Sequence, residues 1–320
     1  MITEVVENCQ ISSQAFRLTL DCAEIAAKAS PGQFVMIRVN QGQAAPLLRR
    51  PFSIHRLWWT CGSGSHSQGQ FSPGYQGQPS PGYQDEHQSS PGSRYGQPPS
   101  GIQILFRVVG EGTAYLASLV KGAKVDLIGP LGHGFELKEP DYCPVLIAGG
   151  IGVVPLLFLA DRIKEKNSWP AVATANPSAA EKKQDNPLAR PWLFFGGKTA
   201  GDILCRDEFQ RLGFSLAIYT EDGSLGQKGL ISEPLAAFLE QMISCGLKPS
   251  LFACGPIPLM YRVAEIARQY RLSGQVSLEQ RMACGVGACM GCVVEVVRGK
   301  NPPDYKRVCT EGPVFDISGF

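Results

Sequence analysis

Apolar and polar residues alternate in short runs over the first 57 residues of the chain. The stretch 34–39 (Phe-Val-Met-Ile-Arg-Val) follows the turn pair Pro31-Gly32, and a similar stretch returns at residues 103–109. Short alternating runs bounded by turn residues are typical of antiparallel strands. We therefore predict an antiparallel β-barrel over residues 1–140, with the glycine-rich stretch 129–135 at its end.

From about residue 141 the pattern changes to continuous apolar runs that alternate with helical periodicity. The apolar runs lie at 145–148, 192–195, 215–219 and 250–253, and the helical patterns lie at 155–166, 230–241 and 257–270. This alternation predicts a parallel α/β domain over residues 141–272. Beyond Gly274 the sequence becomes rich in glycine and cysteine, and we assign residues 273–320 to a small third domain.

Two polar stretches interrupt these patterns. In the first, at about residues 58–101, 30 of the 40 residues from Cys61 to Ser100 are Gly, Ser, Gln or Pro, and Ser-Pro-Gly-Tyr-Gln occurs twice. Such a composition cannot bury enough apolar surface to offset its ordering entropy, so we expect a disordered insert in a hairpin loop. A tyrosine-bearing interaction tail is the alternative. The second stretch, at about residues 166–190, is expected to form a surface loop.

Composition and charge narrow the class of function. The 320-residue chain carries a formal charge of +2, and its Lys and Arg residues form no basic stripe. Nucleic-acid binding needs such a stripe to neutralise phosphates, so we do not expect it. The first residues lack the pattern of a signal peptide, and the longest apolar stretch, 145–160, is too short and too interrupted by glycine to span a bilayer. We expect a cytoplasmic protein with no membrane span.

Four cysteines near the end of the chain form the most specific motif. Cys284, Cys289 and Cys292 have the spacing C-x4-C-x2-C, and Cys309 follows at a distance. This is the plant-type spacing for a 2Fe-2S cluster. The intervening glycines allow the backbone to wrap tightly, so that amides can donate to the sulfurs. A structural zinc site is the alternative, but it favours paired C-x2-4-C knuckles, and only one C-x2-C pair is present.

The predicted barrel carries two weaker motifs. The stretch 49–54 (Arg-Arg-Pro-Phe-Ser-Ile) lies on a predicted strand, where an arginine can pair with a nucleotide phosphate and a serine can hydrogen-bond an isoalloxazine edge. The stretch 105–113 (Leu-Phe-Arg-Val-Val-Gly-Glu-Gly-Thr) joins a strand to a short helix whose free amides suit a diphosphate. Taken alone, each glycine here is compatible with an ordinary turn.

Glycine turns also follow the predicted parallel strands. The stretch 148–155 (Ala-Gly-Gly-Ile-Gly-Val-Val-Pro) departs from the dinucleotide fingerprint G-x-G-x-x-G but joins a strand to a helix in the same way. Further turns follow at 195–198, 220–224 and 254–256. Ligands of parallel sheets bind at the carboxyl ends of the strands, so these turns together predict one nucleotide crevice.

In this order, the barrel with R-P-F-S, the loop G-G-I-G-V-V-P, the tripeptide C-G-P and the cysteine cluster resemble the ferredoxin reductase-type flavoprotein superfamily. The stretches 277–289 (Ser-Leu-Glu-Gln-Arg-Met-Ala-Cys-Gly-Val-Gly-Ala-Cys) and 307–315 (Arg-Val-Cys-Thr-Glu-Gly-Pro-Val-Phe) resemble, more closely, the electron transfer subunits of class 1B dihydroorotate dehydrogenase. The resemblance covers nearly the whole chain, and the two inserts are its departures.

This resemblance implies an FAD-binding barrel, an NAD-binding α/β domain and a C-terminal 2Fe-2S domain. It also implies a partner, the FMN-containing catalytic subunit, in a heterotetramer with two copies of each chain that acts in pyrimidine (UMP) biosynthesis. The expected FAD contacts are Arg50, Pro51, Phe52, Ser53, Leu105, Phe106, Arg107, Gly112 and Thr113; the expected NAD contacts are Gly149, Gly150, Gly152, Cys254 and Gly255; the expected cluster ligands are Cys284, Cys289, Cys292 and Cys309.

The implied chemistry is electron transfer from the partner's FMN through the 2Fe-2S cluster and FAD to NAD+. Hydride transfer needs no acid–base pair, so we assign no catalytic residue. Cys254 either lies near the nicotinamide ring or is a small core residue in a tight turn. Glu221 and Asp222 near the crevice favour NAD over NADP, because a carboxylate suits a ribose hydroxyl better than a phosphate.

Two other functions are compatible with these motifs. One is a related FAD and 2Fe-2S reductase subunit that serves ferredoxin, sulfide or glutamate synthase chemistry; it would not copurify with an FMN subunit. The other is a non-enzymatic iron–sulfur redox module that holds no flavin; its absorbance spectrum would show the cluster alone.

Overall fold

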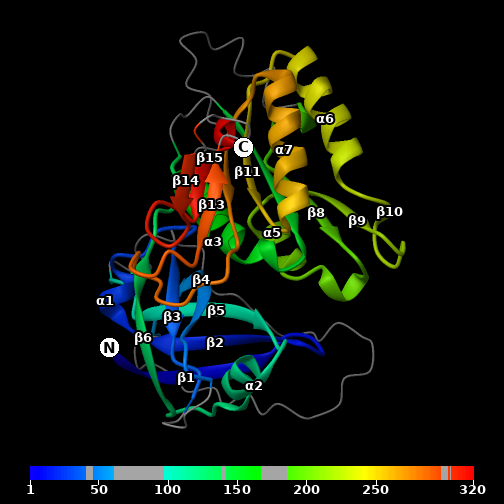
Figure 1. The fold of residues 1–320 in the computed structure, drawn as a ribbon. Coiled ribbons are helices and arrows are strands. Elements are labelled where there is room, and N and C mark those ends of the chain that lie inside the picture. The colour runs from blue at the N-terminus through cyan, green and yellow to red at the C-terminus, as the bar shows by residue number, and fades with distance from the viewer. Residues whose placement is uncertain (41–45, 61–96, 138–141, 167–185, 297–301, 303) are drawn as a thin grey trace, which may run out of the picture.

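The computed structural model describes residues 1–40, 46–60, 97–137, 142–166, 186–296, 302 and 304–320. Of the two expected inserts, residues 61–96 of the first and 167–185 of the second lie outside the described residues. The described chain forms a barrel below an α/β sheet, with the C-terminal segment beside the sheet (Figure 1).

Six antiparallel strands close the N-terminal barrel in the order β1-β2-β5-β4-β3-β6. The alternating sequence pattern explains the barrel, because every second side chain points inward; Leu18 and Leu20 on one strand and Ile102 and Ile104 on its neighbour are fully buried. The strands are β1 (Ile2–Gln10), β2 (Ala15–Asp21), β3 (Phe34–Ile37), β4 (Arg50–Trp58), β5 (Gly101–Arg107) and β6 (Lys124–Leu131), with the helices α1 (Ala23–Ala26) and α2 (Glu111–Ser118).

The second sheet has seven strands in the order β10-β9-β8-β7-β11-β12-β15, parallel from β10 to β12. Figure 1 shows α6 and α7 together on one side of this sheet, with α3 and α5 on the other. The elements are β7 (Cys143–Gly149), η2 (Gly150–Gly152), α3 (Val153–Glu165), η3 (Pro187–Ala189), β8 (Trp192–Gly197), η4 (Ala200–Asp202), α5 (Arg206–Arg211), β9 (Ser215–Thr220), β10 (Gln227–Lys228), α6 (Ser232–Ser244), β11 (Pro249–Cys254) and α7 (Ile257–Tyr270).

The C-terminal segment leaves the sheet and returns to it. It begins with β12 (Ser273–Ser277), continues through the hairpin of β13 (Val293–Val296) and β14 (Asp304–Arg307), and ends in β15 (Val314–Asp316) and η5 (Ile317–Gly319). β15 pairs antiparallel with β12, with Ser277 opposite Val314. The strands that begin and end this segment therefore belong to the α/β sheet. The division into three domains remains a prediction.

Helix α3 joins the barrel to the sheet. Its apolar residues are buried against β7 and β11, yet Phe158 packs in the same hydrophobic cluster as the barrel residues Ile54 and Phe106. In the other direction, Leu105 of the barrel packs in the cluster that contains the sheet residue Leu146. Because each core contains side chains from the other part, the barrel and the sheet share buried surface rather than touching only at their edges.

Polar contacts between β4 and α3 complete this junction. Arg56 donates through Nε and Nη2 to the two carboxylate oxygens of Asp161, at 2.7 Å each. The neighbouring His55 is buried, and its Nδ1 lies 3.1 Å from the carbonyl oxygen of Val154. A carbonyl only accepts, so Nδ1 carries the proton, and Nε2 faces the Cys205 sulfur at 4.0 Å. Burial lowers the pKa of His55 from 6.5 to about 3, although the bond to Val154 opposes the shift.

No helix among the described residues is both long enough and apolar enough to cross a membrane.

The shared core gives a first prediction. Phe158→Ala should lower the free energy of unfolding by about 3–5 kcal/mol, because it removes a buried aromatic side chain from the junction. Ile243→Ala, at a partly exposed position on α6, is the control and should cost less than about 1.5 kcal/mol. Urea denaturation measures both. A loss at Phe158 no larger than that at Ile243 would show that the junction is not a shared core.

The buried histidine gives a second prediction. Below pH 6.5 the unfolded chain binds a proton that the folded protein excludes at His55, so the free energy of unfolding falls as the pH falls from 6.5 towards 3. The stability advantage of the wild type over His55→Gln should shrink by about 2 kcal/mol between pH 7 and pH 5. The control is His133→Gln, which replaces an exposed histidine. Identical pH dependence in wild type and His55→Gln would contradict the prediction.

Candidate functional site

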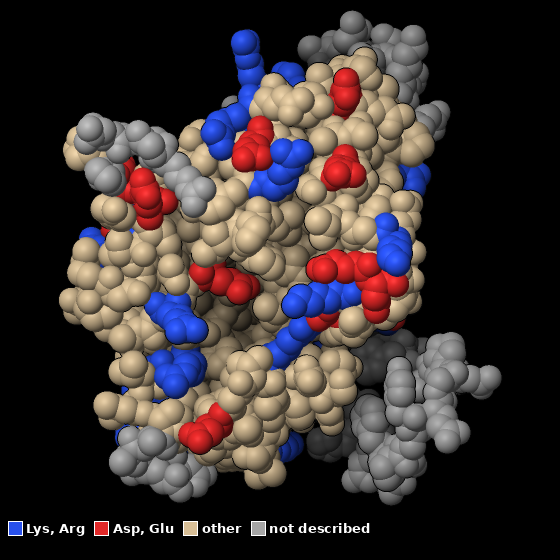
Figure 2. Space-filling view, turned by 45° about the vertical axis from the view of Figure 1, so that its right-hand side comes forward, with Lys and Arg blue, Asp and Glu red and all other residues tan. Residues whose placement is uncertain are grey.

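A cavity of about 1050 Å³ lies where the barrel, the sheet and the cysteine-rich segment meet. Its wall includes Arg50 from β4, Val154 from α3 and Glu279 from the segment after β12, so all three parts contribute. In Figure 2 a hollow opens between the two lobes, and both Lys or Arg and Asp or Glu side chains gather at its rim. The nine residues that the sequence nominates for FAD all line this cavity: Arg50, Pro51, Phe52, Ser53, Leu105, Phe106, Arg107, Gly112 and Thr113.

The first barrel motif lies at the start of β4, where the strand pairs with β3 and Ser53 stands opposite Phe34. The Arg50 guanidinium donates to the carbonyl oxygens of Leu48 and Arg49, at 2.8 and 3.4 Å. Arg50 lines the cavity, so its other guanidinium nitrogens can donate to a phosphate there. Phe52 packs edge-on against Phe106, with ring centroids 5.6 Å apart, and so fixes the floor of the cavity.

The second barrel motif runs from the end of β5 to the start of α2. Thr113 holds this turn, because its hydroxyl accepts from the amides of Val109 and Gly110 at 2.9 and 3.1 Å. Close packing favours glycine at position 112, because a Cβ there would lie 2.8 Å from a methyl carbon of Val39. The helix therefore begins close to the barrel wall, with its first turn facing the cavity.

Arg107, at the end of β5, has a partner that the sequence did not indicate. Its Nη1 lies 2.6 Å from Oδ1 of Asp202, which belongs to the turn after β8. Burial alone would raise the pKa of Asp202, but hydrogen bonds from the Thr199 amide and from Arg107 outweigh burial and lower it. The Nη2 of Arg107 is buried without a partner among the described residues.

These features fit a flavin nucleotide. A buried guanidinium nitrogen without a partner is costly unless a ligand supplies an acceptor. Arg107 and Arg50 supply positive charge for a diphosphate, and Phe34, Phe52 and Leu105 give the cavity the apolar, aromatic wall that a planar ring system requires.

The glycine turns lie together at the carboxyl ends of β7 and β11, which are neighbours in the sheet. A Cβ on Gly152 would lie 2.3 Å from the Cys254 carbonyl oxygen, and one on Gly255 would lie 2.9 Å from Gly149. Gly150 adopts a positive φ of 53°. The five residues nominated for NAD (Gly149, Gly150, Gly152, Cys254 and Gly255) therefore form one compact double turn, of which Cys254 alone lines the cavity.

Cys254 and Glu279 place two titratable groups on the sheet side of the cavity. The Cys254 side chain is buried, and burial raises its pKa, with Glu279 adding to the shift. Desolvation by neighbouring protein atoms also raises the pKa of Glu279, although its side chain is exposed where it lines the cavity. Cys254 therefore lines the cavity and is at the same time buried in the turn.

Three of the nominated cysteines lie on one loop, and the turn after β14 brings Cys309 to it. Cys284 interacts with Cys289, while Cys309 interacts with Cys292 and also with Cys284. Two thiols for each iron are the donor set of a 2Fe-2S cluster. The pairing and the C-x4-C-x2-C spacing therefore fit that cluster better than mononuclear zinc.

Backbone amides surround these sulfurs. The Gly287 amide donates to the Cys309 sulfur at 3.2 Å, and the Cys309 amide donates to the Cys292 sulfur at 3.4 Å. The amides of Val286 and Gly291 make the same kind of bond to the sulfurs of Cys284 and Cys289, at 3.4 Å each. The bond from Val286 is the main cause that lowers the pKa of Cys284 to about 6, while burial raises that of Cys309 to about 11.

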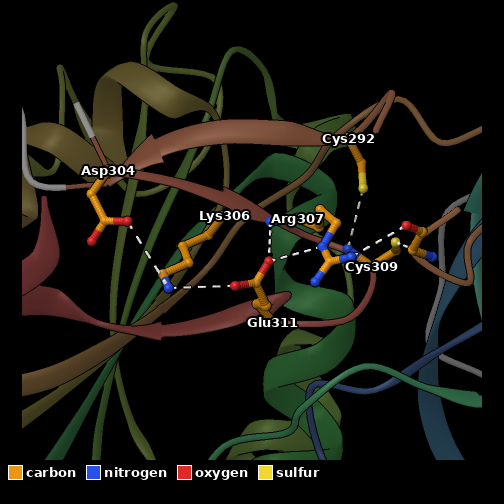
Figure 3. A network of polar contacts seen from close by, with 7 residues as sticks. Cys292, Asp304, Lys306, Arg307, Cys309 and Glu311 are labelled. Carbon is orange, nitrogen blue, oxygen red and sulfur yellow. Dashed lines mark hydrogen bonds and ion pairs between the residues drawn. The ribbon is translucent and has the colours of Figure 1, made fainter. Parts of the chain in front are cut away.

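A network of charged side chains surrounds the turn that carries Cys309 (Figure 3). Arg307 donates to Oε2 of Glu311 from its amide at 2.8 Å and from Nε at 3.0 Å, and Lys306 lies 3.4 Å from Oε1. The bond from the Arg307 amide and those from its side chain lower the pKa of Glu311 to about 2. Because Arg307 also donates to the Gly287 carbonyl at 3.4 Å, the network ties the Cys309 turn to the cysteine loop.

Asp202, Glu279 and Met36 belong to the site or its support, and the sequence analysis did not nominate them. Glu279 could have been found from its place five residues before Cys284. Asp202 has a local signal only for capping, because the pattern Thr199-x-x-Asp202 forms a capping box at η4. Met36 packs beside Gly285 of the cysteine loop, although the two residues are about 250 positions apart in the sequence. No local pattern indicates that contact.

The barrel, the parallel sheet and the segment that leads into the cysteine loop line one cavity. Together with the cysteine motif they define an NAD-dependent oxidoreductase that uses FAD and an iron–sulfur cluster. Two family models match the chain: the iron–sulfur cluster binding domain of dihydroorotate dehydrogenase B, over residues 279–319, and the oxidoreductase NAD-binding domain, over residues 146–265.

Similar proteins show the family to which the chain belongs. The dihydroorotate dehydrogenase B (NAD+) electron transfer subunit of Desulforamulus reducens is 30% identical over 95% of this chain and 92% of its own length. That of Caldanaerobacter subterraneus subsp. tengcongensis is 30% identical over 98% and 96%. The chain belongs to the family of dihydroorotate dehydrogenase B electron transfer subunits.

Solved structures agree on the fold. An NADH-dependent reduced ferredoxin–NADP oxidoreductase structure has a TM-score of 0.65 at 21% identity, over 100% of this chain and 89% of that chain. The FAD/NAD-binding domain of nitric oxide dioxygenase from Vibrio cholerae has a TM-score of 0.53 at 15% identity, over 85% and 93%.

The cysteine loop gives a third prediction. Gly285 has a φ of +72°, and a Cβ there would lie 2.5 Å from Cγ of Met36. Gly122 has a φ of +87° but open space around it. Gly285→Ala should therefore lower iron content and visible cluster absorbance, whereas Gly122→Ala, with similar backbone strain, should leave both at wild-type levels. Equal iron content in both variants would show that the contact with Met36 does not shape the loop.

Proposed function

We propose that this chain takes electrons from the reduced FMN of a separate dihydroorotate-oxidising subunit and delivers them to NAD+. The observation that carries the proposal is the single cavity lined by the FAD candidates of the barrel, by Cys254 of the nucleotide turn and by residues 279–282, which lead into the cysteine loop. The family membership supports the identity of the substrate, and the reaction belongs to pyrimidine biosynthesis.

The residues of this chain bind and orient the groups that carry electrons. When bound, the cluster supplies one-electron transfer and the flavin couples it to hydride transfer with NAD+. Cys284, Cys289, Cys292 and Cys309 would hold the cluster, and the amides that donate to their sulfurs would stabilise negative charge there.

The barrel residues would hold the flavin in the cavity that Cys254 of the nucleotide turn also lines. Arg50 and Arg107 provide the positive charge for its phosphates, and Phe52 and Phe106 provide the apolar wall. Gly149, Gly152 and Gly255 allow the two turns at the carboxyl ends of β7 and β11 to pack closely against each other. A nicotinamide nucleotide would bind at these strand ends, as ligands of parallel sheets do. Val154 and Pro155 give the same cavity an apolar wall.

The partner is proposed to be an FMN-containing dihydroorotate dehydrogenase subunit, in an assembly of two copies of each chain. The name of the relatives, electron transfer subunit, supports the existence of a partner chain. The expected assembly makes no use of nucleic acid or of a membrane.

The fourth prediction tests this function. Chain co-expressed with an FMN dihydroorotate dehydrogenase subunit should contain one FAD and about two irons and should reduce NAD+ with dihydroorotate only in the presence of that subunit. Cys289→Ser should lose most of the iron and this turnover, because it removes one of four cluster ligands. Cys245→Ser, at an exposed free thiol, is the matched control.

The other outcomes are informative. FAD and iron without turnover of dihydroorotate would indicate a related reductase with another electron source. A chain that binds iron but no flavin would contradict both readings. Unchanged iron content in Cys289→Ser would remove the proposed ligand set.

A further inference from the structure

Asp202 connects the flavin side of the cavity to the nucleotide side with one carboxylate. Oδ1 lies 2.6 Å from Nη1 of Arg107, while Oδ2 accepts from the amides of Lys198 and Thr199 at 2.9 Å each. Arg107 ends barrel strand β5, whereas Lys198 and Thr199 form the turn at the carboxyl end of β8, where a parallel sheet binds its ligand. The two oxygens therefore serve two different parts of the protein.

Capping of η4 accounts for only one of these oxygens. In η4 the N-cap is Thr199, and Asp202 is the third helical residue, whose side chain accepts the N-cap amide. In η3 and η5 it is the N-cap residue itself, Asn186 or Asp316, whose side chain accepts one backbone amide of the helix. Acceptance of the N-cap amide uses Oδ2 alone, so capping does not explain the ion pair that Oδ1 makes with Arg107. Asp202 is also largely buried, with 16% of its side chain exposed, so solvent screens its contact with Arg107 only in part.

The surrounding residues hold this carboxylate in place. Gly197 lies against it, and a Cβ at Gly197 would be 2.7 Å from Cβ of Asp202. The turn is tied to the next strand end, because the Ala200 amide donates to the Ser224 hydroxyl at 2.7 Å, which in turn donates to Asp222 at 2.6 Å. An ion pair and then hydrogen bonds thus link Arg107 through the turn to Asp222, after the end of β9.

Arg107 itself offers one more donor. With Nη1 engaged by Asp202, Nη2 is buried and has no partner among the described residues, while the side chain lines the cavity. A guanidinium fixed on one side by a carboxylate presents its other nitrogens in a rigid direction, which lowers the entropy cost of binding a ligand acceptor.

We propose that Asp202 is a positioning residue that fixes Arg107 for FAD and fixes the Lys198–Thr199 turn for the nicotinamide nucleotide, and so couples the two binding sites. The inference rests on the proposed function only in taking FAD as the occupant of the cavity and a nicotinamide nucleotide as that of the crevice. It does not require dihydroorotate or a partner chain.

The fifth prediction tests this coupling with Asp202→Asn and the control Asp316→Asn, which makes the same change at an exposed cap. Asp202→Asn should weaken FAD binding to the full chain by about tenfold, as loss of a charge-assisted bond predicts, and Asp316→Asn should not. Titration of FAD into flavin-depleted protein measures this. With ferricyanide as acceptor, the KM for NADH should also rise in Asp202→Asn, with kcat nearly unchanged.

A double-mutant cycle separates positioning from a merely structural role. In an Arg107→Ala background, Asp202→Asn should no longer weaken FAD binding, whereas its effect on the KM for NADH should persist. The same loss of FAD affinity in both backgrounds, or a loss equal to that of Asp316→Asn, would overturn the proposal. If Asp202→Asn does not fold, Asp202→Glu against Asp316→Glu asks the same question, because a displaced carboxylate should also weaken FAD binding.

These readouts distinguish the inference from the proposed function. A wild-type complex that fails to turn over dihydroorotate, while the FAD cycle behaves as predicted, would refute the partner reaction and support the role of Asp202. A wild-type chain that binds no FAD would refute both.

Discussion

The seating of helix α3 on strand β4 is the constraint on which the rest of the structure depends. It places Phe158 in the barrel core and pairs Arg56 with Asp161, so the barrel and the sheet cannot shift independently. The cavity lies directly beside this junction, and Val154 and Pro155 from the start of the same helix line it. Electron transfer between bound groups depends on fixed separations, and here one packed helix holds the two binding surfaces at a fixed separation.

Local pattern was sufficient for most of the elements and for the presence of an iron–sulfur cluster domain. Strands and helices with clear periodicity, such as β7, α3 and α7, lie within a few residues of the predicted ranges, because each buries one continuous apolar set. The short α5 was not predicted, since six residues carry little periodicity. The cysteine spacing identified the cluster loop, because only a few ligand spacings close around two irons.

Contacts between distant segments could not be predicted in this way. The ion pair of Arg107 with Asp202 joins residues 95 positions apart in the printed sequence, and each has an ordinary local reason to be present. The return of β15 to the sheet was likewise missed, because three residues beside a glycine turn give no strand signal of their own. Such contacts arise from topology, and the positions of the two sheets must be known before they can be stated.

The pairing of Ser277 with Val314 has a consequence for how this protein could have been assembled. The whole cluster-binding segment leaves the sheet and re-enters it at adjacent positions of two paired strands. A segment with neighbouring ends behaves as a cassette: it can be lengthened, shortened or exchanged at little entropic cost to the scaffold that carries it. A flavin reductase of this architecture could therefore acquire or lose a metal cluster by a single insertion or deletion, with its nucleotide-binding sheet left intact.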